Sequence, residues 1–146
     1  MTMETLTIDP KTVDLEELIE IGTRLHGHLG PFLVAGIRMG LLALKLLESP
    51  GYFGIKAVSE TGNKTPLSCL TDGVQIGSGC TTGKGNLEVI PAGAARARFE
   101  TEDGRAVTIA LRPEIRAEFE SGDLHQESER AKGMPVEELF TWKIER

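Results

Sequence analysis

The sequence predicts an α+β fold, in which helices pack on one mixed β-sheet of about four strands. The first half of the chain contains two strongly helical segments, at 14–27 and 31–48. The second half contains short apolar segments of the kind that form strands, and Asp103-Gly104 between 94–101 and 106–112 is a strong hairpin signal. The expected order is roughly α-α-β-α-β-β-β-α, which is an α+β arrangement.

The two N-terminal helices have clear boundary signals. Asp14 is a plausible N-cap of the first helix, and Gly27 ends it. Pro31 opens the second helix, where its missing N–H costs nothing. This second helix is apolar almost all round, except that Arg38 and Lys45 lie seven residues apart and share one face. We therefore expect a mostly buried helix with a single polar stripe.

The rest of the chain is assigned from local patterns. The expected elements are a strand at 52–61, a helix at 66–77, a glycine-rich loop at 78–86, strands at 87–91, 94–101 and 106–112, and charged helices at 113–121 and 125–133. Residues 134–146 are expected to form a short terminal element, with Phe140 and Trp142 docking on the body. No internal repeat or linker divides the chain, so residues 1–146 are expected to form a single domain.

Composition excludes several classes of protein. The 146 residues are 40% hydrophobic and 26% charged, as in ordinary soluble proteins, and the net charge of −6 lacks the basic footprint of a nucleic-acid binder. No signal peptide is visible, and the longest apolar run is too short and too interrupted to span a membrane comfortably. We expect a soluble cytoplasmic protein that binds neither nucleic acid nor membrane. In that compartment Cys69 and Cys80 are free thiols or thiolate ligands rather than a disulfide.

Two of the three histidines lie in the segment "HGHLGP" at 26–31. The residue before a proline is pushed toward extended geometry, and on an extended segment residues two apart point the same way. His26 and His28 could therefore converge beside a helix N-terminus. Imidazole and thiolate ligands suit zinc and other transition metals, and Cys69 or Cys80 would supply the sulfur. Alternatively, the histidines bond to the backbone and Cys69 is a small buried hydrophobe.

Asp72 and His125 are two further residues of interest. Asp72 comes three residues after Cys69 on the same helical face, so it is either a hydrogen-bond acceptor for a ligand histidine or an exposed carboxylate. His125 stands in a charged helical stretch and is expected at the surface.

The loop "GSGCTTGKGN" resembles a phosphate loop only superficially. A Walker loop needs glycine where Ser78 stands and a hydroxyl residue where Gly85 stands. What remains is a tight loop with Thr81, Thr82 and Lys84 available as polar contacts, or else a structural turn.

Two sequence segments together resemble the FmdE family of formylmethanofuran dehydrogenase proteins. They are "LHGHLGPFLVAGIRMG" and, some forty residues on, "CLTDGVQIGSGCTTGKGNL". Members of that family are typified by His-Gly-His-x-Cys-Pro and by a later Cys-x-x-Asp-x-x-Gln…Gly-Cys-Thr-x-Gly-Lys-Gly-Asn. The resemblance spans about residues 14–112 and implies an α+β core with helices on a mixed sheet. Some members add a C-terminal zinc ribbon, and this chain has no cysteine beyond Cys80 with which to build one.

The resemblance implies a metal site formed by His26, His28 and Cys69. The residues that match the rest of the second motif are Asp72, Gln75, Cys80, Thr81, Gly83, Lys84, Gly85 and Asn86. Gly30 stands where the family pattern usually has cysteine, so one soft ligand is missing and Cys80 or solvent would complete the shell. Three protein ligands plus water would make an open site, the arrangement expected for catalysis.

Three functional hypotheses follow from the resemblance. The first is a small metal-binding protein, with zinc as the expected metal, accessory to one-carbon or molybdenum/tungsten-enzyme metabolism such as methanogenesis. The second is a metal-dependent enzyme acting on a small molecule, and the third is a non-metal interaction subunit. Dehydrogenase activity in this chain alone is not expected, because two cysteines cannot hold a four-cysteine iron–sulfur cluster. A homodimer is expected from Phe140, Trp142 and the apolar second helix, along with association with a larger oxidoreductase complex.

Overall fold

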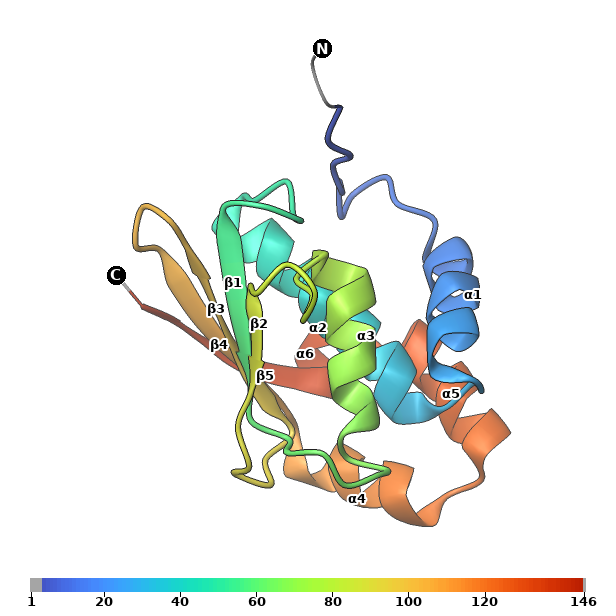
Figure 1. The fold of residues 1–146 in the computed structure, drawn as a ribbon. Helices are drawn as coiled ribbons and strands as arrows, with labels where there is room; N and C mark the ends of the chain where they lie inside the picture. The colour runs from blue at the N-terminus through green and yellow to red at the C-terminus, as the bar shows by residue number, and fades with distance from the viewer. Residues whose placement is uncertain (1–3, 146) are drawn as a thin grey trace.

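The computed structural model describes residues 4–145, in which helices cover one face of a five-stranded mixed sheet (Figure 1). The α+β prediction is confirmed. The helices are α1 (Leu15–His26), α2 (Pro31–Leu47), α3 (Cys69–Ser78), α4 (Pro113–Ser121), α5 (Leu124–Gly133) and α6 (Val136–Leu139). The strands are β1 (Ile55–Ser59), β2 (Leu87–Val89), β3 (Arg96–Thr101), β4 (Ala106–Leu111) and β5 (Phe140–Glu145).

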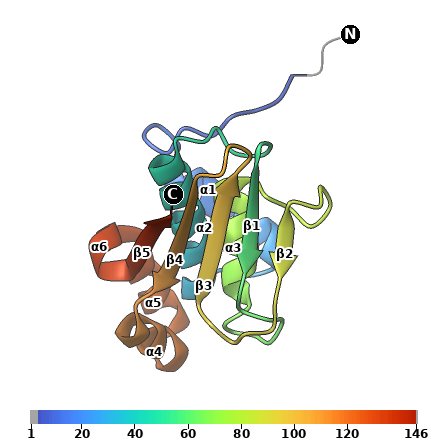
Figure 2. The ribbon, with the colours of Figure 1, turned by 90° about the vertical axis from the view of Figure 1, so that its left-hand side faces the viewer.

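The strand order in the sheet is β2-β1-β3-β4-β5, with β1 and β2 parallel and the other neighbours antiparallel. Inward side chains alternate along the strands, so that Ala57 pairs with Phe99 and Ile109 with Trp142 on the helix side. The opposite face is open in Figure 2, where the strands lie in front of the helices. It carries ion pairs such as Arg98–Glu145, with Nε 2.7 Å from Oε2. One face of the sheet therefore carries the core and the other is polar.

The C-terminal element contains a fifth strand that was not predicted from the sequence. Residues 140–145 form β5, which completes the sheet by antiparallel pairing with β4. Its outer half is exposed and charged, so its apolar pattern is weak, and pairing with β4 defines it. Phe140 is fully buried and Trp142 is partly buried against the chain's own core. The predicted docking of both residues is therefore intramolecular, and Phe140 offers no surface for a dimer.

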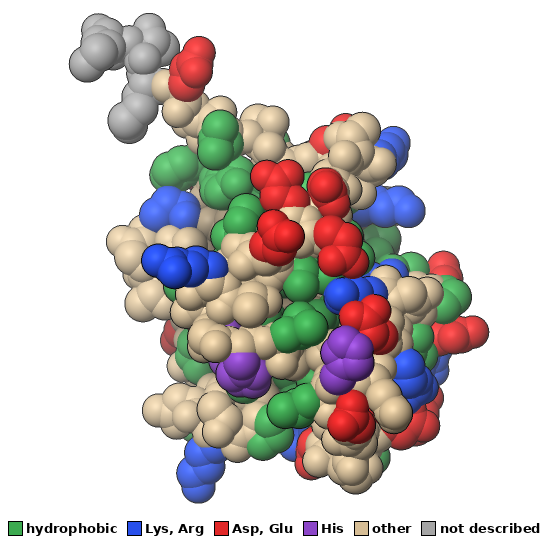
Figure 3. Space-filling view, turned by 90° about the vertical axis from the view of Figure 1, so that its right-hand side faces the viewer, with side chains coloured by type: hydrophobic (Ala, Val, Ile, Leu, Met, Phe, Trp, Pro, Cys, Tyr) green, Lys and Arg blue, Asp and Glu red, His purple; other side chains and the backbone are tan. Residues whose placement is uncertain are grey.

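Helix α2 lies between the sheet and the outer helices α1 and α5 (Figure 1), which explains why it is apolar almost all round. Its polar residue Arg38 has a specific partner, because the guanidinium donates to the carbonyl oxygens of Ala131, at 2.9 Å, and Met134 at the end of α5. Buried in this way, α2 also contributes little to any dimer surface. Figure 3 shows the outer helical face, where acidic side chains gather and histidine side chains reach the surface.

Helices α2 and α3 pack unusually closely because each presents two glycines to the other. A Cβ on Gly36 would lie 2.1 Å from the carbonyl oxygen of Leu70, and one on Gly40 would lie 3.0 Å from the Cα of Gly77. Gly73 is the corresponding partner of Gly36, with the two backbones in contact. Only glycine permits this approach. Because Gly36 meets Gly73 and Gly40 meets Gly77, the helices run parallel and their N-termini lie side by side.

Helix α3 begins later than the sequence predicted. Residues 66–68 form a tight turn instead, in which the N–H of Cys69 bonds to the carbonyl of Pro66 at 3.1 Å. Cys69 is thereby the first residue of the helix. Among residues 4–145, no helix is long and apolar enough to cross a lipid bilayer.

Candidate metal centre

The structure brings the three predicted ligands together from three separate segments. His26 is the last residue of α1, His28 lies in the connection to α2, and Cys69 is the first residue of α3. Their potential ligand atoms all lie within 4.8 Å of one another. The two imidazole rings are 4.7 Å apart between centroids and tilted by 47°. One cation could contact all three groups after small side-chain rotations.

The histidines converge for a different local reason from the one predicted. His26 is helical rather than extended, and Gly27 then reverses the chain in the left-handed conformation with φ 103°. That conformation favours glycine. Gly30 is extended at φ −158° and ψ 159°, as expected for a residue before proline. The turn at Gly27 therefore returns His28 to the side of His26.

Asp72 fixes the orientation of the His26 ring. The Nδ1 of His26 lies 2.6 Å from Oδ2 of Asp72, and Gln75 donates to Oδ1 of the same carboxylate at 3.2 Å. Because a carboxylate only accepts, Nδ1 carries the ring proton of a neutral His26 and Nε2 is left as a free lone pair. Nε2 is buried and has no hydrogen-bond partner among the described residues. A buried acceptor without a partner is costly, and a metal ion would satisfy it.

His28, which lies at the surface, also has an acceptor beside its Nδ1. Its Nδ1 lies 3.0 Å from the carbonyl oxygen of Leu29, which can only accept. Nε2 of His28 is then the unprotonated nitrogen. Backbone or carboxylate acceptors on Nδ1 are the usual partners of metal-binding histidines.

Cys69 is buried and its thiol holds its proton in the metal-free protein. Burial raises the pKa of this thiol, and the negative charge of Asp72 raises it further. A bound cation reverses this balance, since metal binding displaces the thiol proton. Two imidazole nitrogens and one thiolate are a donor set that fits zinc.

A cleft of about 550 Å³ opens beside these groups. It lies between α3, the loop after β1 and the end of β2. Its lining residues are His26, Gly62, Asn63, Thr65, Ser68, Cys69, Thr71, Asp72, Gln75, Thr82, Val89 and Pro91. A small molecule in this cleft would lie next to the proposed ligands.

Cys80 and most of the predicted loop contacts lie elsewhere. Cys80 follows the C-terminal end of α3, fully buried, with Sγ 3.8 Å from the carbonyl oxygen of Ile55. It is not part of the group formed by the two histidines and Cys69. We therefore leave it out of the proposed ligand set.

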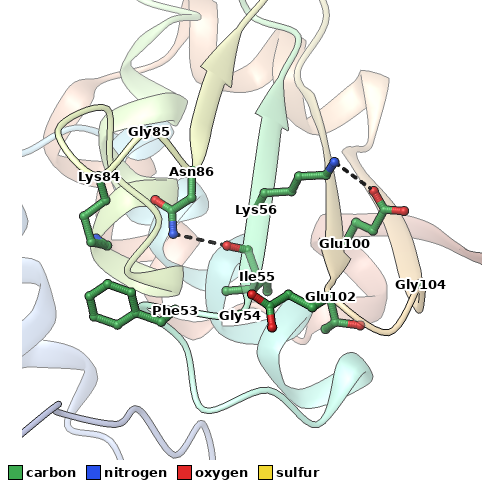
Figure 4. A pocket seen from close by; sticks show the side chains of 11 residues that line it. Phe53, Gly54, Ile55, Lys56, Lys84, Gly85, Asn86, Glu100, Glu102 and Gly104 are labelled. Carbon is green, nitrogen blue, oxygen red and sulfur yellow. Dashed lines mark hydrogen bonds and ion pairs between the residues drawn. The ribbon is translucent and has the colours of Figure 1, made fainter.

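The glycine loop is held by its own polar side chains. Lys84 donates to Oγ1 of Thr81 at 2.9 Å, and the amide of Asn86 donates to the carbonyl oxygens of Tyr52 and Ile55 at 2.8 and 3.1 Å. Figure 4 shows Lys84 and Asn86 at a second cavity, of about 460 Å³, opposite Lys56 and Glu100. The loop reaches the metal cleft only through Thr82, whose N–H lies 3.5 Å from Oε1 of Gln75.

Two features of the site were not predicted from the sequence. One is the buried hydroxyl cluster of Ser59, Thr61 and Thr71, which comes from β1, its exit and α3 and follows no motif. The other is the glycine contact between α2 and α3. Its signal was present as two Gly-x-x-x-Gly segments, "GIRMG" at 36–40 and "GVQIG" at 73–77.

Comparison with known proteins identifies the family. A family profile described as "FmdE, Molybdenum formylmethanofuran dehydrogenase operon" matches residues 25–146. The chain belongs to the FmdE family. The match includes His26, His28 and Cys69, and it continues past residue 112, where the motif resemblance ends.

Two relatives of this FmdE-family chain are informative. The crystal structure of a "tungsten formylmethanofuran dehydrogenase subunit e (fmde)-like protein" from Syntrophus aciditrophicus is similar, with a TM-score of 0.71 and 25% identity, over 97% of this chain and 77% of that one. A "Probable S-adenosyl-L-methionine-binding protein" from Archaeoglobus fulgidus is 35% identical over 85 residues, which is 54% of this chain. The match covers only 22% of that relative's length, so most of that protein lies outside it.

Proposed function

We propose that this FmdE-family chain binds one divalent transition metal, zinc by preference, through His26, His28 and Cys69. The observation that carries the proposal is Nε2 of His26. It is buried, lacks a partner among the described residues, and is left unprotonated by the bond from Nδ1 to Asp72. A buried lone pair next to a second imidazole and a thiol has the chemistry of a metal ligand.

The test is the metal content of protein purified without chelators, measured by elemental analysis. We expect about one equivalent of zinc per chain, consistent with three protein ligands at one site. His26→Ala and Cys69→Ala should each remove it, while His125→Ala should retain it, because His125 is exposed on α5. Circular dichroism of each variant checks that the fold is intact. Metal-free protein that also fails to bind added zinc at micromolar concentration would refute the proposal.

The biological role that we propose is that of an accessory protein in one-carbon or molybdenum/tungsten-enzyme metabolism. Family membership supports this role, because the family is described by a formylmethanofuran dehydrogenase operon. The proposal includes a cytoplasmic location and association with a larger oxidoreductase complex. Co-purification of the tagged chain from its native cells tests the association.

A metal-dependent enzyme is the second candidate, and the cleft beside the ligand group favours it. When bound, the metal would supply Lewis acidity at the edge of the cleft. The residues of this chain would orient His26 through Asp72 and place the hydrogen-bonding side chains of Thr71 and Gln75 around a small molecule. Zinc-dependent turnover in a screen of small-molecule substrates, lost in His26→Ala, would favour the enzyme.

A homodimer remains a further proposal, and it requires a surface other than Phe140 and α2. Ile21 and Leu25 on the outer face of α1 are exposed apolar side chains, at 48% and 57%. Sedimentation analysis of the purified chain tests the oligomeric state.

A further inference from the structure

A cluster of three buried hydroxyls lies against the metal cleft and is not part of the proposed ligand set. Ser59 is the last residue of β1, Thr61 comes two residues later, and Thr71 belongs to the first turn of α3. The Oγ1 of Thr71 is 2.7 Å from Oγ of Ser59 and 2.9 Å from Oγ1 of Thr61. Thr71 also lines the cleft, together with Cys69 and Asp72.

The direction of the hydrogen bonds in this cluster follows from counting protons. Thr61 lies 2.8 Å from the carbonyl oxygen of Gly62, which only accepts, so Thr61 donates its single proton there. The bond between Thr61 and Thr71 must then use the proton of Thr71. Consequently, the bond between Ser59 and Thr71 uses the proton of Ser59. The order is Ser59 to Thr71 to Thr61 to the Gly62 carbonyl.

This order leaves Thr71 with no proton to offer to the cleft. Its oxygen accepts one bond from Ser59 and keeps a second lone pair. A longer contact of 3.5 Å, from Ser59 to Thr61, does not alter the count, because Ser59 has a single proton and lies much closer to Thr71. Thr71, which lines the cleft, can therefore enter a further hydrogen bond only as an acceptor.

We propose that the cleft selects small molecules that donate a hydrogen bond, through a hydroxyl or amino group, to Oγ1 of Thr71. The other end of such a molecule would lie at the group formed by His26, His28 and Cys69, so the inference rests on the proposed metal site. A group that can only accept, such as a carboxylate oxygen, would face the lone pair of Thr71 without a proton between them. Leaving a buried acceptor pair unsatisfied in this way lowers affinity.

The probes are three small ligands added to the protein loaded with Co²⁺ in place of zinc. Imidazole and 4-methylimidazole keep an N–H donor, whereas 1-methylimidazole has the same metal-binding nitrogen and no donor. Their dissociation constants are read from the change in the cobalt absorption spectrum. We expect the two N–H ligands to bind about tenfold more tightly than 1-methylimidazole, the effect of one buried hydrogen bond. The 4-methyl compound controls for the bulk of the methyl group.

Two variants locate the source of the preference. Thr71→Val removes the acceptor and should abolish the tenfold preference. Thr61→Val keeps Thr71 but frees its proton. In this variant imidazole should still bind more tightly than 1-methylimidazole, but the difference in affinity should be smaller than in the parent protein. Equal affinities for imidazole and 1-methylimidazole in the parent, or an unchanged preference in Thr71→Val, would overturn the inference.

A neutron crystal structure of the perdeuterated protein tests the proton order without any metal. We expect the deuterium of Thr71 to point at Thr61 and that of Thr61 to point at the Gly62 carbonyl. A Thr71 deuterium that points into the cleft would overturn the inference even if Co²⁺ binds. A protein that binds no Co²⁺ would instead overturn the proposed metal site, and with it the selection that depends on that site.

Discussion

Replacing Asp72 with asparagine is a sharp test of how the metal site is held together. The carboxylate accepts from Nδ1 of His26 at 2.6 Å and from the amide of Gln75 at 3.2 Å. Asparagine keeps the shape of aspartate but has only one accepting oxygen. If that oxygen stays with Gln75, the asparagine NH₂ faces Nδ1 of His26, and the ring proton moves to Nε2. That proton would then occupy the nitrogen needed by the metal.

Two effects of this substitution oppose each other. Losing the hydrogen-bond partner of His26 lowers the affinity for the metal, typically by 10- to 100-fold, which is about 1.4 to 2.7 kcal/mol. Losing the negative charge of Asp72 removes the smaller of the two causes that raise the pKa of the Cys69 thiol, the larger being burial. A lower thiol pKa would strengthen metal binding. Because the hydrogen bond is direct and the charge effect is secondary, we expect a net loss of about tenfold or more.

The assay is a zinc competition titration against a chromophoric chelator at pH 7.5. Glu88→Gln is the matched control, since it removes one negative charge from an exposed site on β2. The melting temperatures of the metal-free proteins should be similar. Zinc affinity that is unchanged in Asp72→Asn, with an intact fold, would refute the argument that Asp72 sets the tautomer of His26.

The remaining predictions concern Gly30, Gly73 and the two thiols. Gly30→Cys should tighten zinc binding about tenfold or more, and the cobalt-loaded variant should gain thiolate-to-cobalt absorption. The reason is that residue 30 is extended and its Cβ would lie 3.4 Å from Cε1 of His28. Unchanged affinity and an unchanged spectrum would contradict this prediction. Gly73→Ala should lower the free energy of unfolding by about 1–3 kcal/mol or more in chemical denaturation, because its Cβ would lie 2.2 Å from the carbonyl oxygen of Leu33. The control is Gly83→Ala, whose Cβ would have no described heavy atom within 4 Å, so its free energy of unfolding should be nearly unchanged. Burial raises the pKa of Cys80 as well as that of Cys69, so the folded metal-free protein holds these protons more tightly than the unfolded chain does. The resulting stability is fully present below the ordinary thiol pKa and is lost as pH rises through the higher folded-state values. Denaturation between pH 7 and pH 10 should show this loss, and Cys80→Ala should reduce its slope.

Local sequence signals predicted most of the fold. Asp14, Gly27 and Pro31 mark the ends of α1 and α2 within a residue, because caps and proline act on their own neighbours. Strand β5 was not predicted, because it depends on pairing with β4 rather than on its own pattern. The start of α3 was placed three residues early, since the turn at 66–68 resembles a first helical turn.

The grouping of the candidate residues was predictable from the sequence, but their surroundings were not. His26, His28 and Cys69 stand in recognisable motifs, and the structure places them together. The bond from His26 to Asp72 was anticipated as one of two alternatives for that carboxylate. The hydroxyls of Ser59, Thr61 and Thr71 meet only through tertiary packing, so no spacing in the sequence indicates them.

The glycine contact between α2 and α3 has a consequence for how the proposed metal site would take up an ion. The contact involves backbone against backbone and includes no metal ligand, so it holds the N-termini of both helices in place in the metal-free chain. The chain should therefore keep its fold when the metal is removed, unlike a zinc finger, which folds only when the metal is bound. Such a scaffold would allow a bound ion to exchange reversibly. It would also tolerate a change in the number of ligands, which is consistent with glycine at position 30.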